Sequence, residues 1–104
     1  MAMISLLIKD DPAATHAALR FARAVALAGT QVDRVFFYGR GVLHARGASK
    51  QFWSSWSRKS GARLILCSAS ADAFEMKAGD AFCVEGLGEL IEAGLNSHKV
   101  VSFG

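Results

Sequence analysis

The chain has 104 residues, of which 52% are hydrophobic and 20% charged, and its formal net charge is +3. This length suits one core, so the sequence predicts a single domain over residues 1–104. Its 12 basic and 9 acidic residues form no long run of one sign, which argues against nucleic-acid binding. The apolar excess favours contact with other subunits, and we expect an oligomer.

The first segment, MISLLI at residues 3–8, predicts a strand buried on both faces. It is too short to span a membrane and is soon followed by two aspartates rather than by a cleavage site, so we expect a cytoplasmic protein without a membrane anchor. The next segment predicts a helix, because Asp11 can cap its start, Pro12 suits its first turn and Gly29 ends it.

The remaining segments alternate between strands and helices. We predict strands at 34–38, 62–67, 81–86 and 98–104, helices at 50–60, 68–79 and 87–95, and a glycine-punctuated loop at 39–49. Strands that are almost wholly apolar indicate a parallel sheet covered on both faces. The predicted fold class is α/β, as a single three-layer α/β/α domain with a five-stranded, mainly parallel sheet.

Cys67 is the last residue of a predicted strand and stands directly before a helix. Reactive groups of parallel sheets gather at the carboxyl ends of the strands. Unpaired N–H groups at a helix start favour the thiolate, which is the attacking form of cysteine. Ser68 and Ser70 could cap this helix and donate hydrogen bonds to the sulfur. A small buried apolar side chain is an equally open interpretation of Cys67.

Three polar side chains, Arg40, His44 and Arg46, fall on the loop that we expect to overhang Cys67. The two arginines could hold an anionic sulfur species or dock an acidic patch of a partner protein, and His44 could exchange a proton with the thiol. The alternative for each of them is a place on a solvated loop.

Other patterns are weaker. Cys83 stands between apolar residues and is interpreted as core, and the two cysteines have neither metal-ligand nor disulfide-scaffold spacing, so no metal is expected. Trp53 and Trp56 favour helix packing or a subunit interface over base stacking. The turn with Gly86 and Gly88 does not match the glycine pattern of dinucleotide-binding proteins, so a small nucleotide-binding domain is the least favoured hypothesis.

Three stretches of the chain carry a family resemblance: FARAVALAGTQVDRVFFYGRGVLHA, RLILCSASA and GLGELIEAGLNSHKVVSFG. Together they resemble the DsrE/TusD family of small sulfurtransferases, also called DsrE/DsrF-like, over nearly the whole chain. The resemblance implies a cytoplasmic α/β fold that carries sulfane sulfur as a persulfide on the cysteine aligned with Cys67. It also implies small sulfur-carrier proteins as donor and acceptor, oligomers of related subunits, a role in tRNA 2-thiolation or sulfur oxidation, and no cofactor.

The chain departs from this family after Cys67, where Asp72 and Glu75 occupy positions that are usually basic. Acidic groups near a thiol raise its pKa, so the departure bears on the activity and partners of Cys67. Our leading hypothesis is a sulfur-relay protein that uses Cys67. The alternative is a non-catalytic subunit or interaction module of the same fold, in which Cys67 is incidental.

Overall fold

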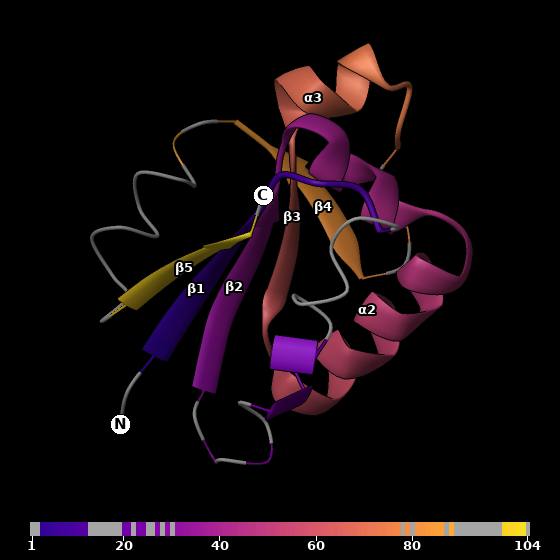
Figure 1. Ribbon diagram of the computed structural model, residues 1–104. Coiled ribbons are helices and arrows are strands. Elements are labelled where there is room, and N and C mark those ends of the chain that lie inside the picture. Colours follow the sequence, from indigo (N-terminus) through magenta and orange to yellow (C-terminus); the bar gives the residue numbers. More distant parts are fainter. Residues whose placement is uncertain are drawn as a thin grey trace.

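The computed structural model describes residues 3–12, 20–21, 23–24, 27, 29, 31–77, 79, 81–86, 88 and 99–103. Five strands form one sheet (Figure 1): β1 Met3–Ile8, β2 Gln31–Phe37, β3 Arg63–Cys67, β4 Phe82–Glu85 and β5 Lys99–Phe103. Their order is β4-β3-β2-β1-β5, and the four neighbouring pairs are parallel. The α/β class with a five-stranded parallel sheet is therefore confirmed.

Three helical elements are described in full: the 3-10 helix η1 Gly39–Ala45, α2 Gly47–Ser60 and α3 Ser68–Ala73. Residues 20, 21, 23, 24 and 27 of the first predicted helix are helical. The helix predicted at 87–95 falls outside the described residues, apart from residue 88, which is helical. The third layer of the predicted domain is therefore not part of what the structure describes.

The predicted loop at 39–49 is wrong. Gly39 and Gly47 adopt positive φ angles of 55° and 64°, which turn the chain into η1 and then into α2. Val42 and Ala45 are buried, so η1 is held by packing as well as by its own hydrogen bonds. The two glycines are the first residues of these helices, whereas the sequence pattern alone suggested an irregular segment.

Two other boundaries differ from the prediction. β2 begins at Gln31 because its first residues pair with β1, where Met3 lies opposite Gln31, and this tertiary pairing overrides their polar character. α3 ends at Ala73, well before the predicted end at residue 79, because the chain leaves the helix at Phe74 and takes a φ of 55° at Glu75.

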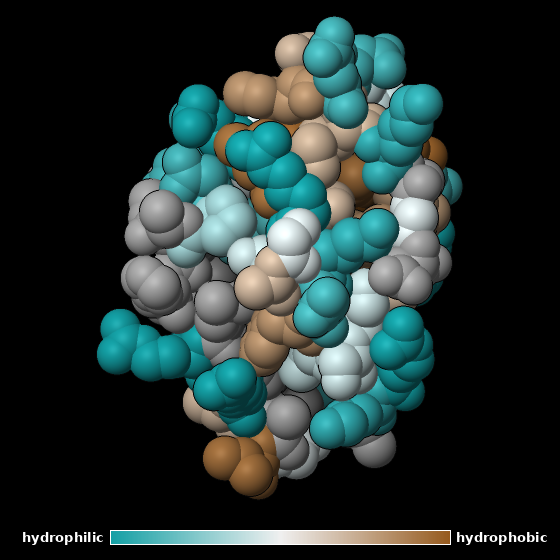
Figure 2. Space-filling model, turned by 90° about the vertical axis from the view of Figure 1, so that its right-hand side faces the viewer, coloured by the Kyte–Doolittle hydropathy of each residue, from teal (hydrophilic) through white to brown (hydrophobic). Residues whose placement is uncertain are grey.

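The two faces of the sheet carry separate hydrophobic clusters, because successive side chains of a strand point to opposite sides. The first cluster packs against α2 and includes Leu6, Phe37, Leu64, Trp53 and Trp56. The second cluster consists of Phe36, Ile65 and Cys67, with Leu7, Tyr38 and Cys83 packed against it. Figure 2 views the molecule from the side on which α2 lies, and polar side chains cover much of that surface.

The carboxyl ends of the strands meet η1, α3 and the segment after β1, at the top of Figure 1. The N–H of Tyr38 donates to the carbonyl of Ile8 over 3.0 Å, which continues the pairing of β1 and β2 beyond the strands. Gly41 lies so close to the end of β1 that a Cβ added there would stand 2.0 Å from the Ile8 carbonyl oxygen. This edge therefore has a closely packed base on which functional side chains can be fixed.

Candidate functional site

Cys67 lies where the sequence places it, as the last residue of β3 and the N-cap of α3. Its backbone is extended, with φ −61° and ψ 125°, so the chain turns from strand to helix at the cysteine itself. Only 6% of the residue is exposed, and its neighbours on the same face are Phe36, Ile65 and Tyr38. The thiol is thus held at the carboxyl edge of the sheet, between an apolar floor and the start of a helix.

The serines after Cys67 do not cap α3, and that prediction is wrong. The N-cap is Cys67, and its side chain makes no capping hydrogen bond. The hydroxyl oxygen of Ser70 instead accepts the N–H of Gly39 over 2.8 Å, which ties α3 to the start of η1. Ser68 is half-buried, and its Oγ faces Gly86 beyond the end of β4. Ser70 therefore positions the helix that begins at Cys67.

Arg40 and Arg46 are exposed and line one pocket of about 400 Å³ with Asp11, Pro12, Leu43 and Gly47. Arg40 donates to the carboxylate of Asp11 over 3.1 Å, and its guanidinium lies 5.9 Å from the ring centre of Phe74. Phe74 is the C-cap of α3, so Arg40 lies between the segment after β1 and the far end of that helix. Both arginines are open to solvent, with the charge of Arg40 paired with Asp11 in the wall of the same pocket.

His44 is not beside Cys67, and its predicted role in proton exchange with the thiol is wrong. The residue is fully buried, and its ring lies 5.4 Å from that of Phe37, on the opposite face of the sheet from Phe36 and Cys67. Within η1, Arg40 points outward and His44 points into the core. A segment predicted as an irregular loop gives no basis for expecting opposite directions for these two side chains.

Both ring nitrogens of His44 have partners. The indole Nε1 of Trp53 donates to Nδ1 over 3.0 Å, and because indole can only donate, Nδ1 must be the unprotonated nitrogen. Nε2 therefore carries the hydrogen and donates to the carbonyl of Asp10 over 3.0 Å. Burial lowers the pKa of His44, against smaller opposing effects of the Asp10 carbonyl and the Asp11 charge. His44 is a neutral structural residue that joins η1, α2 and the segment after β1.

The sequence did not predict the polar side chains that lie around Cys83. Its Sγ lies 3.5 Å from the carbonyl oxygen of Leu64 and 3.7 Å from a carboxylate oxygen of Glu85, which in turn pairs with Arg63 over 2.7 Å. Burial and the charge of Glu85 raise the pKa of Cys83, with Arg63 opposing them. Cys83 is therefore held as the protonated thiol, which is a poor nucleophile. Only the strand register brings these residues together, and no local motif signals it.

The two cysteines lie on the same face, but they are not opposite each other. Cys83 pairs with Ile65 in register, two residues before Cys67, and both thiols are free. Strand spacing and rise place their Cα atoms about 8 Å apart, beyond the span of about 7 Å that a disulfide tolerates. They therefore act as two separate thiols.

The described residues contain no group of three or more His, Cys, Asp or Glu side chains that could hold a metal ion. Within the same ranges, no helix is both long and apolar enough to cross a membrane. At the carboxyl edge, Cys67 lies on the face of Phe36 and Ile65 and opposite Glu85 in the strand register. Arg40 and Arg46 line a separate pocket with Leu43 and Gly47.

The sequence model of the DsrE/DsrF-like family matches residues 3–103. The chain belongs to the DsrE/DsrF-like family. Two curated relatives are both named sulfurtransferase TusD. The one from Serratia proteamaculans is 32% identical and the one from Cronobacter sakazakii is 33% identical, each over 83% of this chain and over 84% and 85% of their own lengths. The expected family is confirmed.

Solved structures share the fold of this chain at low sequence identity. The ychN protein from E. coli aligns with a TM-score of 0.80 and 18% identity, covering 99% of this chain and all of its own. A protein of unknown function from Bacteroides thetaiotaomicron aligns with a TM-score of 0.77 and 19% identity, over 97% and 94%. Identity this low supports the shared fold and says nothing further about the chemistry of this family member.

Proposed function

We propose that this protein is a sulfur-relay protein that carries sulfane sulfur as a persulfide on Cys67. The observation that carries the proposal is the place of Cys67, at the end of a parallel strand and the start of a helix, in a chain similar to two TusD sulfurtransferases. Cys83 is unsuited to the role, because its pKa is raised and its sulfur lies beside a carboxylate.

The transfer takes place in two thiol exchange steps. The thiolate of Cys67 attacks the outer sulfur of a donor persulfide, so that a new S–S bond forms on Cys67 while the donor's own S–S bond breaks and the donor leaves as a thiolate. An acceptor thiolate then attacks the outer sulfur on Cys67, and Cys67 leaves as the thiolate. Sulfur is passed on without net oxidation or reduction, so no cofactor is required.

The surroundings of Cys67 suit a carrier that protects its cargo. With 6% of the residue exposed, a persulfide there would be shielded from small thiols in solution and would be reached when a partner protein docks against the carboxyl edge. The first N–H groups of α3 follow Cys67 directly and have no partners within the helix, so they can stabilise the negative charge of the persulfide.

We further propose that Arg40 and Arg46 guide small acidic sulfur-carrier proteins to this edge. Both side chains are exposed on the same pocket, and opposite charges on a partner would speed its approach. Asp72 and Glu75 are exposed at the far end of α3, so they face solvent rather than the apolar floor beneath Cys67. The two free thiols suit a reducing compartment such as the cytoplasm, where we expect the protein to act.

The experiment is to incubate the purified protein with a protein persulfide donor and to measure its intact mass. We expect wild type and Cys83→Ser to gain the mass of one sulfur atom, a gain that a reducing agent reverses. Cys67→Ser should gain none. The Cys83→Ser variant is the matched control, since it removes the neighbouring thiol on the same face of the sheet.

The low exposure of Cys67 also fits the second candidate, a non-catalytic subunit or interaction module of the same fold. The same experiment separates the two functions. If wild type takes up no sulfur, or if Cys67→Ser takes it up as well as wild type does, the carrier function is rejected. Copurification of the unloaded protein with a loaded family member would then support the second candidate.

A further inference from the structure

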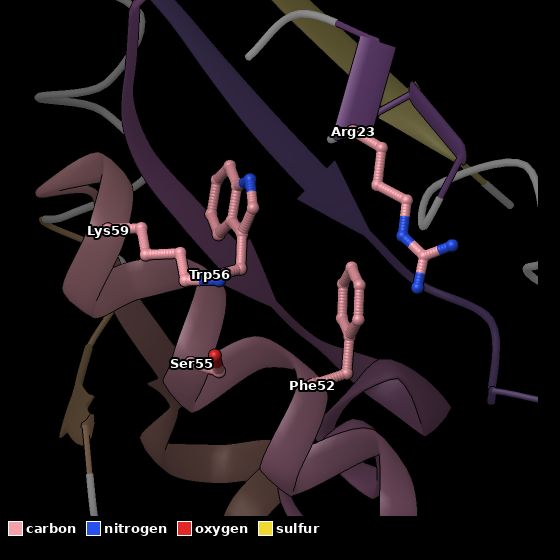
Figure 3. A pocket seen from close by; sticks show the side chains of 5 residues that line it. All are labelled: Arg23, Phe52, Ser55, Trp56 and Lys59. Atoms are coloured by element: carbon pink, nitrogen blue, oxygen red, sulfur yellow. The ribbon is translucent and has the colours of Figure 1, made fainter. Parts of the chain in front are cut away.

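A second pocket lies far from Cys67 in the fold, between α2 and the helical residues around Arg23. Its volume is about 300 Å³, and its described walls are Arg23, Phe52, Ser55, Trp56 and Lys59. Figure 3 shows the rings of Phe52 and Trp56 rising from α2 and Arg23 reaching over from the other segment. This pocket lies on the α2 side of the sheet, whereas Cys67 belongs to the cluster on the opposite face.

The walls of this pocket combine aromatic surface with positive charge. Arg23 and Lys59 are both exposed, and none of the described lining residues is acidic. The Arg23 guanidinium carbon lies 5.1 Å from the centre of the Phe52 ring, which holds the charge over an apolar surface. Such walls match a ligand that has a flat apolar body and a negatively charged group.

Trp56 adds an unused hydrogen-bond donor. The residue is 8% exposed, and its Nε1 is buried without a hydrogen-bond partner among the described residues. An unpaired buried N–H group costs free energy, and an acceptor that reaches it recovers that cost. Because this nitrogen has almost no exposed surface, the side chains around the indole must shift for the contact to form. In Figure 3 the nitrogen of the indole is on the edge of the ring turned towards Arg23. The other tryptophan of α2, Trp53, has its indole N–H bonded to His44.

We propose that the pocket between Arg23 and α2 binds a small organic anion, with its apolar body between Phe52 and Trp56 and its acidic group near Arg23 and Lys59. A carboxylate and a phosphate ester share this chemistry. The site is independent of the sulfur chemistry proposed for Cys67, because no residue is common to the two.

The test uses naphthoate as the probe and the two indole N–H signals of the ¹⁵N-labelled protein as the readout. Trp56→Phe assigns the signals. We expect the Trp56 signal to shift and saturate with naphthoate while the Trp53 signal stays in place, because that N–H is already bonded to His44. The neutral analogue naphthalene methanol should bind at least tenfold more weakly, and phenyl phosphate should shift the same signal if phosphate esters are also accepted.

Arg23→Gln and Lys59→Gln should each weaken naphthoate binding by about fivefold, as expected for the loss of one exposed charge. Both side chains are exposed, so the fold should persist, and an unchanged Trp53 signal will verify it. Cys67→Ser should bind naphthoate like wild type. A Trp56 signal that does not move with naphthoate, equal binding of naphthalene methanol, or unchanged affinity in both charge variants would overturn the proposal.

Discussion

At the scale of single residues, the contrast between His44 and Cys67 is instructive. Both are within the buried part of the carboxyl edge, yet the nitrogens of His44 are fully used by Trp53 and Asp10, whereas the side chain of Cys67 makes no capping bond. A side chain whose polar atoms are all hydrogen-bonded within the protein has a structural role, because a reaction at those atoms would break hydrogen bonds that stabilise the fold. The hydrogen bonds of His44 and Cys67 therefore distinguish their roles more clearly than their amino-acid types do.

The burial of His44 predicts that the protein loses stability in mild acid. Burial lowers the pKa of His44, so the folded state binds a proton less tightly than the unfolded state. Its stabilising contribution is complete above the ordinary histidine pKa of about 6.5 and declines as the pH falls below that value. We expect the melting temperature to drop by several degrees between about pH 7.5 and pH 5.5.

Thermal unfolding of His44→Gln supplies the comparison. Glutamine keeps one donor and one acceptor but does not titrate in this range. The variant should be less stable than wild type at neutral pH, and its melting temperature should change less with pH. Parallel pH profiles for the two proteins would show that other groups cause the acid sensitivity.

At the scale of elements, the close approach of η1 to β1 predicts that Gly41 tolerates no side chain. An added Cβ would stand 2.0 Å from the backbone oxygen of Ile8, and a backbone atom cannot swing away as a side chain can. We expect Gly41→Ala to lower the free energy of unfolding by about 3 kcal/mol or more, at or above the upper range for overpacking. Urea unfolding measures this loss.

Gly61→Ala is the matched control for Gly41. Gly61 ends α2 with a φ of 78°, and an added Cβ there meets no atom within 4 Å. The control should therefore cost only the left-handed backbone, about 1–2 kcal/mol. If Gly41→Ala proved no more harmful than Gly61→Ala, η1 would have to be free to move away from β1.

At the scale of the whole molecule, the positions of Arg40 and Arg46 predict a separation between docking and chemistry. Charge reversal of both residues to Glu should slow sulfur transfer from a carrier protein by about tenfold or more, because steering of the acidic partner is lost. Loading of Cys67 from a small-molecule persulfide should stay close to that of wild type. Transfer rates by quenched-flow mass analysis at two salt concentrations measure both effects.

Lys59→Glu is a suitable control for this charge reversal. It changes one charge in the same direction at the other end of α2, away from η1 and the pocket that Arg46 lines. Transfer from the carrier protein should be little affected. Equal slowing by Lys59→Glu would mean that net charge, and not this surface, governs the approach of the partner.

Much of the fold follows from local patterns in the sequence. The apolar run ending at Cys67 and the small polar residues after it predict a strand followed by a helix, because both elements depend on nearby residues. The opposite directions of Arg40 and His44 depend on the turn of η1. The contact of Cys83 and Glu85 with Arg63 depends on the register between β3 and β4. Neither the turn of η1 nor the strand register is recorded in local propensity, so the sequence predicted the place of Cys67 at the end of a strand correctly and misjudged its surroundings.

The strand order also bears on how the sheet assembles. β1, β2, β3 and β4 pair as successive neighbours, but β5 returns to the open side of β1, where Lys99 lies opposite Ile4. Pairing β5 with β1 closes nearly the whole chain into a loop, and the entropic cost of closure comes before any stabilising contact forms. This pairing should therefore form late in folding. Until it forms, β1 presents an unpaired edge to other chains. We therefore expect a newly made chain to be most exposed to aggregation before β5 arrives, and Cys67 takes no part in that step.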